Sequence, residues 1–192
     1  DVTLYMADKS PLSQIGGFPF HRGVLAIGER PENQSLDACF ADYSPAGRWV
    51  ICPELNDVEN LGSLMRTAAA LGVRHFLLGP SCCDPFARRA LRTSMGAVFY
   101  VTLIRSQHLK RDLLGLKEKA HITLHAAVLD AAATPLQHIK IPRNFGLVFG
   151  TEAQGLAPEW RQLCDQLVTL PMQNQVDSLN ITVAAGILLY AY

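Results

Sequence analysis

The amino-acid sequence predicts an α/β domain built on a mainly parallel, six-stranded sheet with helices on both faces. Six short apolar runs of strand length recur between residues 48 and 192. Segments with helical spacing of apolar residues separate these runs, which is the arrangement that parallel strands require. The chain has 192 residues, of which 49% are hydrophobic, enough for one domain with a sizeable core.

Each expected element follows from a local pattern. The expected strands are Trp49–Cys52, His75–Leu78, Val98–Leu103, Ile122–Ala127, Phe145–Phe149 and Leu167–Met172. The expected helices are Asn60–Leu71, a segment that starts at Asp84 and continues through Leu91, Ser106–Lys119, Pro158–Cys164 and Leu179–Tyr190. Gly72 is a residue type that commonly ends a helix. Asp84 followed by Pro85 is typical of a helix start, with aspartate as the N-cap and proline at the first helical position. Residues 128–144 carry no clear pattern.

Charge is unevenly distributed along a chain whose formal net charge is zero. Residues 1–60 carry four basic and nine acidic residues, whereas residues 66–119 carry ten basic and three acidic ones, a net of +7. This basic middle segment predicts a face that binds polyanions. A solvated helix surface with scattered charge explains it about as well.

The cysteines, the histidines and the length of the apolar runs indicate the compartment of the protein, and residues 1–47 indicate a domain boundary. Five cysteines without a C-x-x-C pair argue against a disulfide framework or a zinc site, and the six histidines lack metal spacing, so we expect no metal. No apolar run reaches membrane-spanning length, so we expect a cytoplasmic protein without a membrane partner.

The chain opens on Asp1 and is expected to be a piece of a longer protein. Residues 1–47 are expected to be the remnant or linker of an upstream substrate-binding domain, and residues 48–192 the main domain.

Three loops follow expected strands at the edge where parallel sheets bind ligands: residues 54–62, 150–156 and 171–178. In the first, Asn60 is expected to cap a helix, and Arg66 is a charge on an otherwise apolar helix, which more often packs or pairs than catalyses. In the third, Ser178 stands where the last helix should be capped, and Asn180 falls in its first turn.

The second loop is a tight turn between Gly150 and Gly155 that carries one carboxylate, Glu152. It lacks the Lys-Ser/Thr pair of a phosphate loop, and the chain has no G-x-G-x-x-G and no G-x-S-x-G. Nucleotide hydrolysis, a dinucleotide fold and an α/β-hydrolase are therefore disfavoured. A ligand loop and a plain turn with a surface glutamate both remain open.

The three loops together resemble the motifs of one family. The first motif is Asn60-Leu61-Gly62, then Arg66-Thr67-Ala68-Ala69-Ala70 and Gly72; the second is Leu147-Val148-Phe149-Gly150-x-Glu152-x-x-Gly155-Leu156. The third is Leu170-Pro171-Met172 followed by Ser178-Leu179-Asn180-Ile181. In order and spacing they are similar to the SpoU (TrmH-type) RNA methyltransferases of the SPOUT superfamily. Phe20–Ala26 also resembles the end of that family's N-terminal substrate domain, and Asn174 departs from the glycine that many members carry.

The resemblance implies a function and a set of site residues. S-adenosylmethionine would be bound by Gly150, Leu170 and Leu179, with Met172 and Ser178 close by, and its methyl group would pass to a ribose 2′-OH of tRNA or rRNA. Arg66, Asn60, Glu152, Ser178 and Asn180 would form the catalytic cluster, in which we expect Glu152 and Asn180 to hold Arg66 as an electrostatic clamp. Arg66, Arg88, Arg89 and Arg92 would contact RNA. A deep trefoil knot near the C-terminus and a homodimer formed through that region are also implied.

Two other functions remain open at this point. One is a non-catalytic RNA-binding or assembly factor with the same fold, which predicts loss of the motif residues; all of them are present. The other is a knotted methyltransferase that acts on a base, which needs a different acid or base in the first loop. The arginine pattern of the first motif favours the ribose enzyme.

Overall fold

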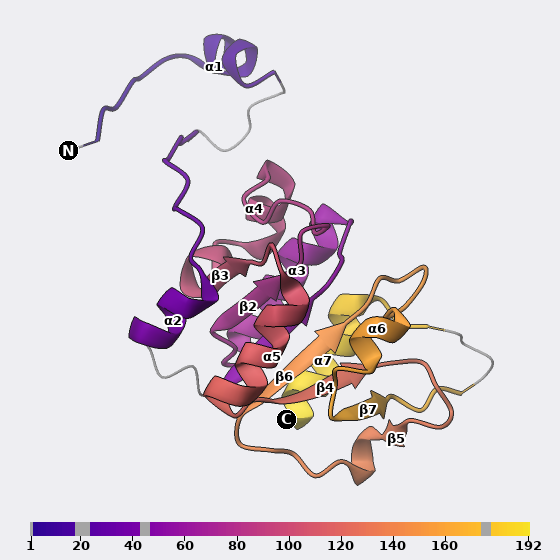
Figure 1. Ribbon diagram of the computed structural model, residues 1–192. Coiled ribbons are helices and arrows are strands. Elements are labelled where there is room, and N and C mark those ends of the chain that lie inside the picture. Colours follow the sequence, from indigo (N-terminus) through magenta and orange to yellow (C-terminus); the bar gives the residue numbers. More distant parts are fainter. Residues whose placement is uncertain (1, 18–23, 43–46, 174–177) are drawn as a thin grey trace. The chain divides into compact units, whose positions relative to one another are not determined.

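The computed structural model describes residues 2–17, 24–42, 47–173 and 178–192 (Figure 1). Asn174 and the first four residues of the segment Phe20–Ala26 lie outside these ranges. The chain forms two compact units, Asp1–Pro31 and Glu32–Tyr192. The first unit contains α1 (Lys9–Gly16), which buries no side chain. All elements described below belong to the second unit.

The second unit is built on a parallel sheet of seven strands in the order β3-β2-β1-β6-β4-β7-β5. All pairings between these strands are parallel. The strands are β1 (Arg48–Cys52), β2 (His75–Leu78), β3 (Thr102–Arg105), β4 (Thr123–Ala127), β5 (Thr134–Pro135), β6 (Phe145–Phe149) and β7 (Gln166–Thr169). The predicted α/β class with a parallel sheet is therefore confirmed.

Two strand predictions were wrong. The sheet has seven strands, because the two-residue β5 pairs with β7 at the sheet edge. It escapes sequence analysis since it is too short to show a period and contains Pro135, which has no N–H to donate. The apolar run expected as Val98–Leu103 instead forms a 3₁₀ turn, η1 (Ala97–Tyr100), before β3 starts at Thr102. Phe99 and Tyr100 are exposed, so their apolar character does not report a buried strand.

Helices cover both faces of the sheet (Figure 1). One face carries α3 (Val58–Ala70), α4 (Arg88–Ser94) and α7 (Ile181–Ala191); the other carries α2 (Leu36–Asp42), α5 (Leu109–Ala120) and α6 (Pro158–Arg161). A second 3₁₀ turn, η2 (Leu136–His138), follows β5.

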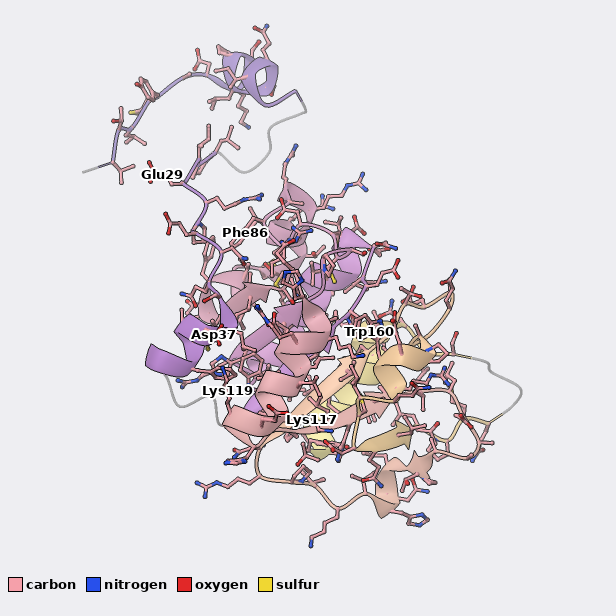
Figure 2. The ribbon with its side chains drawn as sticks, viewed as in Figure 1. Glu29, Asp37, Phe86, Lys117, Lys119 and Trp160 are labelled. Carbon is pink, nitrogen blue, oxygen red and sulfur yellow. The ribbon has the colours of Figure 1, made fainter. Side chains whose placement is uncertain are left out.

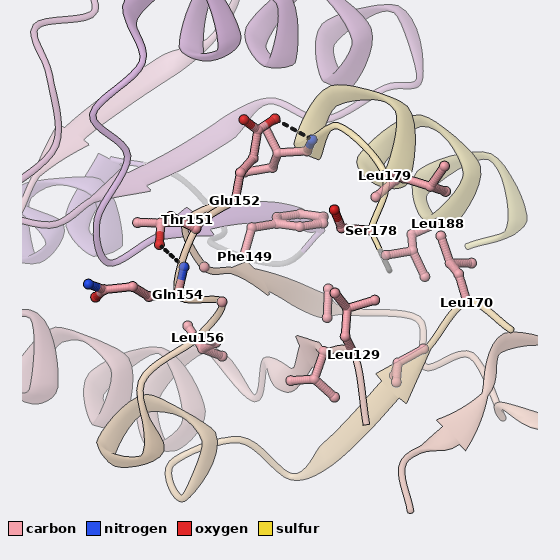
Figure 3. Close-up of a pocket in the computed structure, with 18 of the residues that line it drawn as sticks. Leu129, Phe149, Thr151, Glu152, Gln154, Leu156, Leu170, Ser178, Leu179 and Leu188 are labelled. Atoms are coloured by element: carbon pink, nitrogen blue, oxygen red, sulfur yellow. Dashed lines mark hydrogen bonds between the residues drawn. The ribbon is translucent and has the colours of Figure 1, made fainter. Parts of the chain in front are cut away.

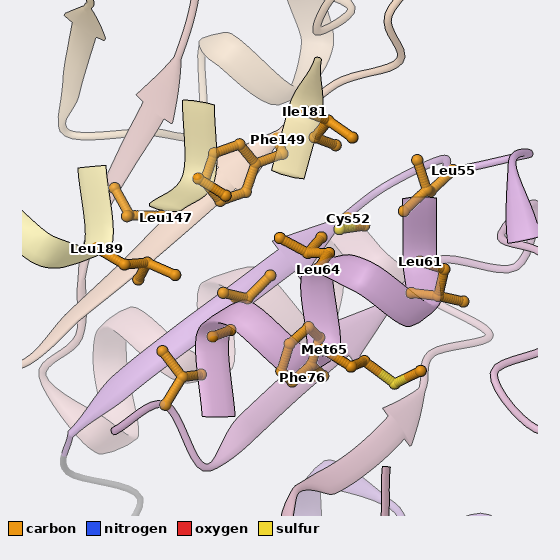
Figure 4. Close-up of a cluster of buried hydrophobic side chains, with 14 of the residues drawn as sticks. Cys52, Leu55, Leu61, Leu64, Met65, Phe76, Leu147, Phe149, Ile181 and Leu189 are labelled. Carbon is orange, nitrogen blue, oxygen red and sulfur yellow. The ribbon is translucent and has the colours of Figure 1, made fainter. Parts of the chain in front are cut away.

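Side chains of β1 show how one strand serves both layers, because successive residues point to opposite faces. Val50 and Cys52 join the cluster under α3 and α7, while Trp49 and Ile51 join the cluster under α2 and α5. Figure 4 shows the first cluster, where side chains of α3 and α7 meet those of the strands. Burial on both faces thus explains why the strands are continuous apolar runs.

Four helix starts differ from their predicted positions, and one of them is α5, which begins at Leu109 rather than Ser106. The N-cap of α3 is Asp57 rather than Asn60, and its Oδ1 accepts hydrogen bonds from the N–H groups of Glu59 (2.8 Å) and Asn60 (2.9 Å). The N-cap of α7 is Asn180 rather than Ser178. Asp84 accepts the N–H of Phe86 in a turn, and α4 begins only at Arg88. Each segment offers several residues that can cap, and the choice depends on tertiary contacts.

Candidate functional site

A pocket of about 330 Å³ opens beyond the C-terminal ends of β4, β6 and β7 (Figure 3). Its walls are residues 127–129 after β4, residues 149–156 after β6, the chain after β7 and the start of α7. This volume falls within the range of small-molecule sites, and the position is the edge where parallel sheets bind ligands. The second and third predicted loops line the pocket, whereas the first does not.

The pocket wall is mainly apolar. Figure 3 shows Leu129, Phe149, Leu170 and Leu188 approaching the same space from three strands' ends and from α7. Glu152 and Arg161 are the charged side chains among the described residues that line it. All five residues expected to bind the cofactor lie in this wall: Gly150, Leu170, Met172, Ser178 and Leu179.

The glycine turn after β6 is closed by its own backbone. Thr151 and Gly155 exchange two N–H···O hydrogen bonds of 3.0 and 2.9 Å, and Gly155 adopts a left-handed φ of +66°. A Cβ on Gly150 would lie 2.1 Å from the carbonyl carbon of Gly155. Because no side chain fits into that space, the glycine at position 150 allows the loop to fold back against the end of β6.

One hydrogen-bond network joins the three loops. Asn180 donates its Nδ2–H₂ group to Asn60 Oδ1 (2.9 Å) and to Glu152 Oε1 (2.8 Å). The same Glu152 oxygen accepts the N–H of Ile181 at 3.2 Å, where a carboxylate is favoured by the helix dipole. Asn180 Oδ1 in turn accepts the N–H of Thr182 at 2.9 Å and so caps α7. Three residues predicted as catalytic therefore meet at the start of α7, with Ser178 just before them in the pocket wall.

The structure does not bring Arg66 to this network within one chain. Arg66 is exposed on α3 and lines a different groove, with Arg74 and Tyr100. No residue that the structure describes forms a hydrogen bond or ion pair with its side chain, so the expected clamp of Glu152 and Asn180 on Arg66 is absent here. The reason is helical geometry: six residues separate Asn60 from Arg66, which rotates Arg66 by about 240° around the helix axis.

The other predicted RNA contacts, Arg88, Arg89 and Arg92, are exposed on α4. Arg92 approaches Glu59 Oε1 at 3.7 Å, with both side chains more than half exposed. Such a pair is weak in water, so Arg92 can exchange Glu59 for another anion. These arginines lie beside α3 and not around the pocket.

Two parts of the pocket were missed from the sequence. Leu129 lines it from the loop after β4. This loop also follows the C-terminal end of a parallel strand, so the rule that points to the other loops applies to it as well. Arg161 of α6 closes the second loop: its Nε donates to the Leu156 carbonyl at 2.7 Å, and its Nη1 lies 3.9 Å from Asp130 Oδ2. No local signal marks that arginine, because only the fold brings α6 against the glycine turn.

Two buried side chains, His125 and Tyr192, contact each other. His125 lies in the interior strand β4, and its Nδ1 is 2.5 Å from the Tyr192 hydroxyl. Burial lowers the pKa of His125, although Asp165 opposes that shift, and burial raises the pKa of Tyr192. None of the five cysteines, all of which lie in the described ranges, forms a disulfide. Among the described residues, no group of three His, Cys, Asp or Glu side chains is placed to hold a metal, and no helix could cross a membrane.

Comparison with known proteins decides the family. The family model described as the SpoU rRNA Methylase family matches residues 47–190, most of the chain. The chain belongs to this family. The resemblance inferred from the three motifs is thereby confirmed, and the SpoU motifs coincide with the two loops of the pocket and with α3.

The relatives of this SpoU family chain include characterised proteins and solved structures. It is 31% identical, over 98% of its length and 77% of the relative's, to the 23S rRNA (guanosine-2′-O-)-methyltransferase RlmB of Acinetobacter baylyi. The AdoMet-bound rRNA methyltransferase of Sinorhizobium meliloti is 26% identical, with a TM-score of 0.74, over 83% of this chain and 60% of that one. The SpoU methyltransferase AviRb of Streptomyces viridochromogenes, in complex with AdoMet, is 25% identical, with a TM-score of 0.71 over 83% and 64%. The chain therefore spans less than two thirds of both structures.

Proposed function

We propose that this chain transfers a methyl group from S-adenosylmethionine to a ribose 2′-OH of RNA. The observation that carries the proposal is the pocket after β6 and β7, which unites the second and third motifs beside the Asn60–Glu152–Asn180 network. The name of the Acinetobacter relative and the AdoMet in the two related structures support the reaction and the cofactor.

The pocket residues fit S-adenosylmethionine. Leucine side chains and Phe149 offer an apolar surface for an aromatic base, and the backbone of the glycine turn offers polar groups at its edge. The one cation in the described wall, Arg161, lies 3.9 Å from Asp130 Oδ2, and this carboxylate offsets the positive charge that a sulfonium would meet. When bound, the cofactor supplies a methyl group already activated by the positive sulfur.

The chain's own residues then act by binding and positioning. Gly150, Leu170 and Leu179 hold the cofactor, and Glu152 with Asn180 keeps the second and third loops at a fixed separation. Ser178 lies in the pocket wall, where its hydroxyl can hydrogen-bond to a ligand. Because the methyl group needs no further activation, orientation of the ribose hydroxyl supplies much of the rate.

Arg66 completes the site from a second copy of the chain. In its own chain Arg66 lies outside the pocket, so the site lacks its arginine unless a partner supplies one. The outer face of α7 exposes Val183, Ile187 and Tyr190 at helical spacing, and this apolar stripe supports a homodimer contact there. A guanidinium stays protonated, so Arg66 would stabilise a phosphate or the developing alkoxide and would not serve as a base.

Other features implied by the family remain our proposals. They are the deep trefoil knot near the C-terminus, a cytoplasmic location, and the origin of residues 1–47 in a substrate-binding domain.

Titration calorimetry with S-adenosylmethionine tests the cofactor assignment. We expect one binding event per chain, and its loss in a Leu179→Asp variant that places a charge in the apolar wall. Absence of binding by the unaltered chain would favour the non-catalytic RNA-binding or assembly factor and overturn the proposal. Methylation of a base after normal cofactor binding would favour the base-methylating alternative.

A further inference from the structure

Two adjoining grooves lie at the opposite edge of the sheet, where β1, β2, β3 and β6 begin. One, of about 840 Å³, is bordered by the end of α3 and by α4 and η1; it includes Arg66, Arg74 and Tyr100. The other, of about 660 Å³, includes Arg48, Arg74 and Arg143. Gly72, Arg74 and His75 line both, so the two form one continuous channel, here called the amino-edge groove.

The amino-edge groove is lined by four arginines. No acidic residue occurs among the described residues that line it. Arg48 donates to the Leu71 carbonyl at 3.0 Å and to the Tyr192 carbonyl at 3.4 Å. The side chains of Arg66, Arg74 and Arg143 form no hydrogen bond or ion pair within the described part of the chain. Three guanidinium groups are therefore available to an anion.

This placement changes the interpretation of the basic middle segment. On α5 several cations have a carboxylate beside them: Arg111 with Asp112 at 3.1 Å, Lys117 with Asp165 at 2.8 Å and Lys119 with Asp37 at 3.1 Å. Figure 2 shows Lys119 and Asp37 next to each other across α5 and α2. The amino-edge groove instead gathers three arginine side chains without a carboxylate beside them, so it offers an anion more positive charge than α5 does.

One further side chain suits a nucleic acid better than a small anion. Tyr100 is 82% exposed beside the arginines, and an exposed aromatic ring next to cations is the usual platform for an unpaired base. Charges spread along a channel, together with an aromatic ring, match an extended strand of phosphates and bases.

We propose that the amino-edge groove binds the backbone of single-stranded RNA, with Arg74 and Arg143 on phosphates and Tyr100 stacked on a base. The inference rests on the proposed function, since it takes RNA to be the substrate. The groove and the cofactor pocket lie at opposite edges of one sheet, so the groove holds a segment of RNA away from the ribose that the same chain methylates. The proposal also adds Arg74, Arg143 and Tyr100 to the RNA-contacting residues predicted from the sequence.

Fluorescence anisotropy with a short labelled single-stranded RNA, without methyl donor and over a series of salt concentrations, tests the proposal. The double variant Arg74→Ala/Arg143→Ala should bind about tenfold more weakly at 0.1 M salt, and the slope of log affinity against log salt should fall by about 1.4, as expected for two lost phosphate contacts. Tyr100→Ala should weaken binding without changing the slope. The matched control, Lys110→Ala/Lys119→Ala on α5, should leave affinity and slope close to those of the unaltered chain.

Several results would overturn the assignment. One is an affinity and slope in the arginine variant equal to those of the lysine control. Another is dissociation of a dimer in the arginine variant, measured by sedimentation velocity, which would make the groove a contact between copies. Cofactor titration of the same proteins separates this failure from failure of the proposed function, because neither Arg74 nor Arg143 lines the cofactor pocket.

Discussion

The amide of Asn180 donates a hydrogen bond of 2.8 Å to the carboxylate of Glu152 across 28 residues of sequence. The same carboxylate accepts the first N–H of α7, so the turn after β6 and the start of the last helix form one unit. A pocket whose two main loops are bonded together is preorganised before any ligand enters. This bond therefore links the fold to the proposed chemistry.

Replacing Glu152 with alanine should slow methyl transfer by at least about tenfold, the effect of losing roughly one positioned interaction. Both hydrogen bonds to the carboxylate disappear, and the loops lose their fixed separation. Thermal unfolding should change little, since the side chain is exposed. Initial rates at saturating donor measure the effect, with Glu159→Ala, an exposed carboxylate outside the pocket wall, as the control. Equal rates for the two variants would remove Glu152 from the site.

Substituting Gly150 with alanine should abolish cofactor binding. The new Cβ would clash with the backbone of Gly155 at 2.1 Å, and the loop could close only by moving. Gly115→Ala on α5 is the matched control, because its Cβ would meet nothing closer than Phe40 at 3.7 Å and alanine favours a helix by about 0.5–1 kcal/mol. Calorimetry and urea unfolding should show lost binding for the first variant and normal binding for the second. Normal cofactor affinity in Gly150→Ala would contradict the account of this turn.

An Arg66→Lys variant should lose methyl transfer but keep its affinity for the cofactor. Lysine keeps the charge without the planar fork that engages a phosphate or oxyanion at two points, and Arg66 does not line the pocket of its own chain. Mixing Arg66→Lys with Glu152→Ala protein should restore part of the activity, because a mixed dimer has one site with both native residues. An active Arg66→Lys protein would exclude the assigned role, and failure of the mixture to recover would contradict supply by a partner.

Acidification should destabilise the fold through its buried histidines. Burial lowers the pKa of His125, and burial together with Arg74 lowers that of His75. Below about pH 6.5 the unfolded chain binds protons that the folded chain does not, so the free energy of unfolding falls as pH falls. Urea unfolding on either side of that pH should show a shallower dependence in His125→Asn than in the exposed control His138→Asn. Identical pH dependences would show that His125 does not carry the effect.

The sequence predicts most of the sheet because strands buried on both faces leave continuous apolar runs, as in Trp49–Cys52 and Phe145–Phe149. It fails where that relation breaks down. Phe99 and Tyr100 are apolar but exposed, and β5 depends on pairing with β7 and not on its own two residues. The predicted helix caps were wrong for a related reason, because each helix start offers two residues that can cap. These are Asp57 and Asn60 for α3, and Ser178 and Asn180 for α7.

The site was predictable to the extent that it follows strand ends. Gly150, Glu152 and Ser178 come directly from the two loops that line the pocket. Leu129, Arg161 and the amino-edge groove were not predictable, because they depend on which segments the fold places side by side. The position of Arg66 was also predicted wrongly. Glu152 and Asn180 meet Asn60 on α3, and six residues further along the helix the side chain of Arg66 points in a different direction.

Transfer of an isotopically labelled methyl group to RNA is the decisive experiment for the proposed reaction. The chain is incubated with S-adenosylmethionine that carries a deuterated methyl group and with bulk RNA, and the RNA is then digested to nucleosides for mass spectrometry. We expect label on the ribose of a 2′-O-methylated nucleoside, and none when the protein carries Arg66→Lys. Label on a base, or no label in RNA from the unaltered protein, would contradict it.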